Sequence, residues 1–173
     1  PKDVQALINI ANNHGYSPNL ISAVEKVNQA QKEVLFSKLT SQLGTDLKGK
    51  KIAIWGLSFK PETDDVREAP ALNLIKSIIK AGGKVNAYDP KAIHEAQFYL
   101  KGFSVNYCSD KYTALEAADA LILVTEWKEF RSPDFDLMRS KMKGNLFIDG
   151  RNQFRSDFIK SKGFLYLQIG VKA

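Results

Sequence analysis

One long connection in this chain carries cationic side chains where a phosphate could bind. An apolar run at 52–55 lies between Lys51 and Gly56 and is typical of a buried parallel strand. About a dozen residues, including Lys60 and Arg67, separate it from a helical pattern that begins at Pro70. Strand–helix connections usually need only about two to six residues. Because ligands of open α/β sheets bind where strands end and helices begin, the connection is a candidate phosphate site. Its residue types fit a solvated surface loop equally well.

A second candidate cation, Arg151, follows another short apolar run at 146–148. The run predicts a strand that leads directly into Asp149-Gly150-Arg151-Asn152. Arginine offers a planar fork to phosphate and lysine a compact point charge. Either Lys60 or Arg151 alone would be interpreted as a solvated charge. We expect both at the carboxyl ends of parallel strands, and two cations converging there suit a diphosphate.

The elements that position these residues alternate between strand and helix. Strands are predicted at 52–55, 84–88, 103–108, 120–124, 146–148 and 164–169, and helices at 70–80, 91–100, 110–118 and 132–142. The expected fold is α/β: a Rossmann-like, mostly parallel sheet flanked by helices, with right-handed crossovers. A helical segment with one long central helix precedes it. We expect a helical segment at 1–46 and the Rossmann-like domain at 47–173.

The long helix, expected at 20–43, would extend over roughly 35 Å. Asn28 and Gln31 interrupt its apolar face. That face either packs on the chain's own domain or meets something else, such as a second subunit or a preceding part of a longer protein.

Composition excludes several classes of protein. The chain of 173 residues is 44% hydrophobic and carries a net charge of +6, typical of a globular protein with anionic partners. Lysines are scattered, which disfavours nucleic acid, and no apolar run is long enough for a membrane. Cys108 is the only cysteine, which fits a reducing cytoplasm and a small buried side chain. His14 and His94 show no metal-ligand spacing, so no metal site is expected.

Two residues at other strand ends invite a nucleotide interpretation. Asp89 follows the second strand, where a dinucleotide site keeps its ribose-binding acid. Gly56-Leu57-Ser58 lacks the second glycine of such sites, however, so Asp89 is interpreted as part of an ordinary turn. Trp127 either stacks on a base or covers the core, and the second interpretation is slightly favoured.

Four segments together resemble the C-terminal part of the UDP-glucose/GDP-mannose dehydrogenase family. They are Pro1-Lys2-Asp3-Val4, the stretch Gly56–Pro70, Thr125-Glu126-Trp127 and Asp149-Gly150-Arg151-Asn152, in the family's order. The resemblance implies NAD-dependent oxidation of a nucleotide sugar, with UDP-glucose favoured over GDP-mannose and UDP-N-acetyl-hexosamine. It also implies that this chain is one piece of such an enzyme, inactive alone, with the long helix at a homodimer interface.

The resemblance further implies individual roles. Phe59, Lys60 and Arg151 match residues that contact the UDP-sugar, and Arg67 matches one that reaches NAD bound mainly by a separate N-terminal domain. Asp3 matches a catalytic carboxylate, although it could equally cap a helix. The family's nucleophilic cysteine would stand two positions before Pro1, and Cys108 does not replace it. Two rival hypotheses are a stand-alone nucleotide-binding module and a nucleic-acid-binding domain.

Overall fold

The N-terminal part of the chain is helical. A computed structural model describes residues 2–171, with side chains from Val4 onward, and divides into two compact units between Val34 and Leu35. Helix α1 spans Lys2–Asn13 and α2 spans Asn19–Leu43. Gln5 donates a hydrogen bond to Glu25 at 3.0 Å, which joins the two helices within the first unit. The predicted long helix is confirmed at 25 residues.

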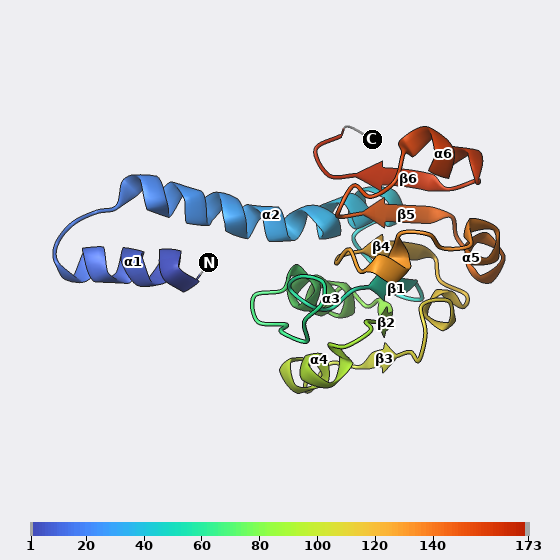
Figure 1. The fold of residues 1–173 in the computed structure, drawn as a ribbon, viewed down its shortest axis with the longest axis horizontal. Helices are drawn as coiled ribbons and strands as arrows, with labels where there is room; N and C mark the ends of the chain where they lie inside the picture. Colours follow the sequence, from blue (N-terminus) through green and yellow to red (C-terminus); the bar gives the residue numbers. More distant parts are fainter. Residues whose placement is uncertain (1, 172–173) are drawn as a thin grey trace. The chain divides into compact units, whose positions relative to one another are not determined.

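The second unit is built on a six-stranded sheet whose strands all pair in parallel. The strands are β1 (Lys51–Trp55), β2 (Lys84–Tyr88), β3 (Val105–Tyr107), β4 (Ala120–Leu123), β5 (Leu146–Asp149) and β6 (Leu165–Gln168). Their spatial order is β3-β2-β1-β4-β5-β6 (Figure 1). The expected Rossmann-like parallel sheet is confirmed. Strand order reverses between β1 and β4, where ligands of such sheets usually bind.

Hydrophobic clusters cover both faces of the sheet, because side chains alternate along each strand. In β1, Ile52 and Ile54 join the cluster beneath helix α3 (Pro70–Lys80), and Ala53 and Trp55 join the opposite one. Helix α4 (Ile93–Tyr99) lies on the side of α3, and α5 (Phe135–Lys141) lies on the other (Figure 1). Every strand residue of β4 is buried. The sheet is therefore a rigid base for the loops that leave its strands.

One predicted helix is wrong and one helix was not expected. Residues 110–118 form only a short 3-10 turn, η1 (Thr113–Leu115). Asp110 caps its start, since its side chain accepts the backbone N–H groups of Tyr112 and Thr113. The turn does not continue into a helix because Ala117 adopts a positive φ of 56° and its backbone N–H donates to the carbonyl of Lys141 at 2.9 Å. A second 3-10 turn, η2, spans Lys128–Phe130, and the unexpected helix α6 spans Ser156–Ser161.

Candidate functional site

The candidate site is the carboxyl edge of the sheet, defined by the loops 56–69, 89–92, 124–127 and 150–155 that follow β1, β2, β4 and β5. Parallel strands all end at the same edge, so Lys60 after β1 and Arg151 after β5 leave the sheet on the same side. Only β4 separates the two strands, which places their axes about 10 Å apart. The common edge expected for these two cations is therefore observed.

The loop after β1 presents Phe59 and Lys60 at its tip. The backbone N–H of Phe59 donates to the carbonyl of Asp65 at 2.8 Å, which closes the intervening residues into a compact turn. The Phe59 side chain is 46% exposed although it is aromatic, and Lys60 is exposed as well. An exposed ring beside an exposed ammonium group offers a flat apolar surface and a cation to a ligand.

Gly56 allows this loop to leave the sheet beside β4. Its φ is 91°, and a Cβ built there would lie 2.5 Å from the Thr125 Cβ. Thr125 in turn donates its hydroxyl to the carbonyl of Ser58 at 2.6 Å. The first residues after β1 are thus fixed against the end of β4 by a close approach that only glycine permits.

Arg67 is held by its own loop. Its guanidinium makes two bonds to Asp65, Nε to Oδ1 at 2.8 Å and Nη2 to Oδ2 at 2.6 Å. These hydrogen bonds raise the pKa of Arg67 above its usual value, so the group is always charged. The same loop and helix α4 line an open hollow of about 250 Å³. Its lining residues are Asp64, Asp65, Val66 and Arg67 of the loop and Glu95 and Tyr99 of the helix. The role expected for Arg67 toward NAD stays a prediction.

Arg151 leaves β5 through a turn built by Asp149 and Gly150. Oδ1 of the fully buried Asp149 accepts the backbone N–H of Arg151 at 2.9 Å. A Cβ on Gly150 would lie 2.7 Å from the Leu123 carbonyl oxygen, so the turn presses closely on the end of β4. The guanidinium pairs with Glu126, which follows β4, with Nη2 2.7 Å from Oε1.

Asp89 is occupied by protein donors. Its Oδ2 accepts from the backbone N–H of Leu57 at 2.7 Å and of Ser58 at 3.1 Å, from the Ser58 hydroxyl and from the Trp127 indole. Its Oδ1 accepts from the backbone N–H groups of Lys91 and Ala92, which confirms the predicted turn. A carboxylate has about four acceptor sites, so none is left for a ribose. These residues do not fit NAD at this point of the edge.

Trp127 covers the core, which confirms the second of its two interpretations. Its side chain is 3% exposed, and its Nε1 donates to Oδ2 of Asp89 at 3.0 Å. Cys108 is buried and free, and burial raises the pKa of its thiol. His14 and His94 are both exposed, and no cluster of metal-binding side chains exists among the residues the structure describes. Within residues 2–171, no helix has the length and apolar character needed to span a bilayer.

Asp3, the expected catalytic carboxylate, has a side chain outside the described residues. Only its backbone is described, as part of α1. Its expected role stays a prediction. The structure instead adds residues that sequence reasoning did not assign to the site, namely Glu126, Asp149 and Asp89. The motif Thr125-Glu126-Trp127 was the only feature of the sequence that pointed to Glu126. Its pairing with Arg151 could not be inferred from the sequence, because the two residues lie 25 positions apart.

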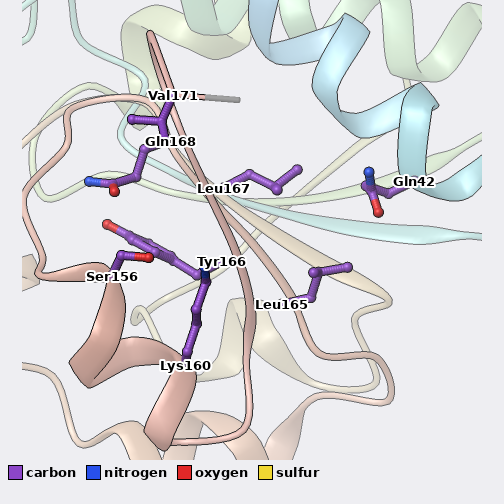
Figure 2. A pocket seen from close by; sticks show the side chains of 8 residues that line it. All are labelled: Gln42, Ser156, Lys160, Leu165, Tyr166, Leu167, Gln168 and Val171. Carbon is purple, nitrogen blue, oxygen red and sulfur yellow. The ribbon is translucent and has the colours of Figure 1, made fainter. Parts of the chain in front are cut away.

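A separate pocket of about 380 Å³ lies beside the edge strand β6 (Figure 2). It is lined by Gln42, Ser156, Lys160, Leu165, Tyr166, Leu167, Gln168 and Val171. None of the predicted site residues lines it. It also lies away from the reversal of strand order between β1 and β4, so the carboxyl edge remains the better candidate site.

Comparison with protein families gives one match, over residues 53–156, to the UDP-binding domain of the UDP-glucose/GDP-mannose dehydrogenase family. The matched stretch contains Phe59, Lys60, Arg67 and Arg151. It covers all four loops of the carboxyl edge and most of the sheet, and it leaves out β6 and the first two residues of β1.

Similar proteins extend the match along the chain. The UDP-glucose 6-dehydrogenase of Pseudomonas aeruginosa is 43% identical over 98% of this chain, and that of Rhizobium meliloti is 39% identical over 98%. This chain spans only 38% of the length of each relative. A solved UDP-glucose dehydrogenase from Pyrobaculum islandicum superimposes with a TM-score of 0.79 at 29% identity, covering 91% of this chain and 34% of that one.

Proposed function

The chain belongs to the UDP-glucose/GDP-mannose dehydrogenase family, and we propose that it is the part of a UDP-glucose 6-dehydrogenase that holds the UDP-sugar. The observation that carries this proposal is that Lys60 and Arg151 follow β1 and β5, the two strands that pair with β4, so both leave the sheet at its carboxyl edge. Two cations on one edge match the two charges of a diphosphate. The family match and the sequence identity to two UDP-glucose 6-dehydrogenases support UDP-glucose as the nucleotide sugar.

In this proposal each residue of the edge has one task. Phe59 provides an apolar surface for the ligand, and Lys60 and Arg151 neutralise the diphosphate. Lysine acts as a point charge, and the arginine fork can donate two parallel hydrogen bonds to phosphate oxygens. Gly56 and Gly150 bring both loops close to β4, so the two cations start from fixed backbone positions.

The reaction proposed for the whole protein is oxidation of UDP-glucose to UDP-glucuronate with NAD. Two NAD would each accept one hydride, first from the alcohol and then from the aldehyde stage, and water would supply the second carboxylate oxygen. The residues around Asp89 do not fit NAD. We therefore propose that NAD binds mainly outside residues 2–171, with Arg67 reaching it from the edge of this chain. Asp3 is proposed to assist the chemistry as a carboxylate.

We also propose a division of labour along the chain. Residues 1–46 would act as a linker and dimerisation segment, and residues 47–173 as the UDP-sugar-binding domain. The exposed apolar residues of α2 support a homodimer, because Leu20, Val24 and Val27 recur at helical spacing and are 80%, 47% and 67% exposed. The buried, free Cys108 fits a reducing, cytoplasmic location.

Calorimetric titration of the chain with UDP-glucose, UDP, GDP-mannose and a short oligonucleotide tests the proposal. We expect UDP and UDP-glucose to bind and GDP-mannose to bind more weakly. A preference for GDP-mannose would overturn the sugar assignment. Binding of the oligonucleotide that falls steeply with salt, together with indifference to UDP, would favour a nucleic-acid-binding domain instead.

A further inference from the structure

Glu126 occupies a rigid position in the motif Thr125-Glu126-Trp127 that the proposed function leaves without a role. Both neighbours are buried, Thr125 at 2% exposure and Trp127 at 3%. Thr125 is bonded to the carbonyl of Ser58, and Trp127 is bonded to Asp89. The backbone of Glu126 is therefore fixed on both sides, while its carboxylate extends to the carboxyl edge.

The carboxylate of Glu126 holds one side of the Arg151 guanidinium. Nε of Arg151 lies 2.5 Å from Oε2, and Nη2 lies 2.7 Å from Oε1. The pair therefore has one hydrogen bond, from Nη2 to Oε1, and one ion-pair contact, between Nε and Oε2. Of the five N–H donors of a guanidinium, the two on Nη1 and the second one on Nη2 lie on the other side of the fork.

We infer that Glu126 is a positioning residue, which holds Arg151 by one side so that the other side faces the diphosphate of a nucleoside diphosphate ligand. The inference rests on the proposed function. A long, half-exposed arginine loses rotamer freedom when it binds a ligand, and a partner that fixes it beforehand removes part of that cost. Both side chains keep contact with solvent, with 45% exposure for Arg151 and 26% for Glu126, so their mutual attraction alone contributes little to stability.

The negative charge of Glu126 also repels the proposed anion, which acts against orientation. If that repulsion outweighed orientation, removing Glu126 would tighten UDP binding. We expect the gain in UDP affinity from a fixed Arg151 to exceed the loss from repulsion by Glu126. Three N–H donors of Arg151 face away from Glu126, and the backbone of Glu126 is fixed, so its carboxylate stays on the far side of the guanidinium. The two effects have opposite signs, so one measurement separates them.

The test measures the dissociation constant for UDP, with uridine as the phosphate-free probe, for the native chain and for Glu126→Ala, Glu126→Gln, Arg151→Lys and the double variant Glu126→Ala/Arg151→Lys. We expect Glu126→Ala to weaken UDP binding about threefold to tenfold and to leave uridine binding unchanged. Glu126→Gln, which keeps one acceptor for Nη2, should retain part of the native affinity. In the Arg151→Lys background, where the fork is gone, Glu126→Ala should change UDP binding less than twofold.

Several outcomes would overturn the inference. If Glu126→Ala binds UDP more tightly than the native chain, Glu126 repels the phosphates more than it positions Arg151. If Glu126→Ala loses the same UDP affinity in the native chain and in Arg151→Lys, the effect of Glu126 does not act through Arg151. A matching loss in the free energy of unfolding, measured with urea, would reduce its role to stability alone. If the native chain binds no UDP, the proposed function fails and this inference fails with it. If the native chain binds UDP and Glu126→Ala matches it, only the inference fails.

Discussion

The indole nitrogen of Trp127 lies 3.0 Å from Oδ2 of Asp89, so the residues that follow β4 are bonded to the end of β2. The same oxygen accepts the backbone N–H of Leu57 at 2.7 Å, which adds the end of β1. One buried carboxylate therefore connects three loops of the carboxyl edge. The position of Lys60, two residues after Ser58, depends on this connection.

Asp89→Asn should destabilise the chain and loosen the edge. The amide nitrogen of asparagine faces N–H groups that need an acceptor, and such buried, unpaired donors cost about 1–3 kcal/mol. We expect the free energy of unfolding to fall by about 2 kcal/mol and the fluorescence of Trp127 to shift to the red. Asp46→Asn is the matched control, because exposed Asp46 also accepts a backbone N–H, from Lys48 at 3.0 Å. Equal urea midpoints for the native chain and Asp89→Asn would contradict the role of this carboxylate.

Gly56→Ala should cost more than its backbone conformation explains. Gly56 and Gly102 have nearly the same φ, 91° and 90°, but an added Cβ meets Thr125 at 2.5 Å in the first case and nothing within 4 Å in the second. In Gly102→Ala the free energy of unfolding should therefore fall only by the cost of placing alanine in a left-handed conformation, about 1–2 kcal/mol. Gly56→Ala should lose about 1–3 kcal/mol more from the clash. Urea unfolding of both variants measures the difference, and equal losses would show that the loop can move away from β4.

The sheet and its loops could be predicted because β1, β4 and β5 each contain a short apolar run that is bounded by polar residues or glycine. A parallel order then follows from alternating helices, and it sends Lys60 and Arg151 to the same edge. The predicted helix at 110–118 was wrong because Ala117 adopts a positive φ of 56° and donates its backbone N–H to the carbonyl of Lys141 rather than to the preceding turn. A hydrogen bond between residues so far apart in the chain does not alter the apolar spacing from which the helix was predicted.

The internal bonds of the site could not be predicted. The partners of Asp89 at Ser58 and Trp127 lie 31 and 38 positions away, and Glu126 lies 25 positions from Arg151. Residue types identify such groups only as charged or polar. Their pairing follows from strand order and from how closely each loop approaches β4, which only the folded chain defines.

Tyr88 should make the chain sensitive to alkaline pH. Burial, together with Glu129, raises the pKa of Tyr88 to about 12, and its hydroxyl donates to Oε1 of Glu129 at 3.1 Å. An unfolded tyrosine has a pKa of about 10. The folded state holds the proton more tightly, so this stabilisation is complete below pH about 10 and is lost as pH rises toward about 12.

Denaturant unfolding between these pH values, with tyrosinate absorbance in parallel, measures the effect. Tyr88→Phe should make the alkaline decline shallower, and Glu129→Gln should move the ionisation of Tyr88 to lower pH. Burial also raises the pKa of Tyr107 and Tyr166, so part of the decline should remain in both variants. An unchanged decline in Tyr88→Phe would exclude Tyr88 as a contributor.

Val27→Lys should weaken the proposed homodimer. Val27 is 67% exposed and shares a helix face with Leu20 and Val24, so a lysine there would place a charge in an apolar interface. We expect light scattering at several concentrations to show a dimer for the native chain and a larger monomer fraction for the variant. Gln29→Lys, an exposed position on the same helix, is the control. A native chain that stays monomeric at every concentration would contradict the dimer.

Lys60→Ala should weaken UDP binding through loss of one charge on the diphosphate. Hydrogen bonds to charged groups contribute about 1.5–3 kcal/mol, which corresponds to a loss of about tenfold or more in affinity. Binding of uridine, which lacks phosphate, should not change. Lys84→Ala is the matched control, because exposed Lys84 begins β2 and so lies at the opposite edge of the parallel sheet. UDP affinity should also depend less on salt concentration in Lys60→Ala, and its salt dependence should be unchanged in Lys84→Ala. Only a cation close to the phosphates attracts them appreciably, and salt weakens that attraction by screening. Equal UDP affinities for the two variants would remove Lys60 from the phosphate site and leave Arg151 as its proposed cation.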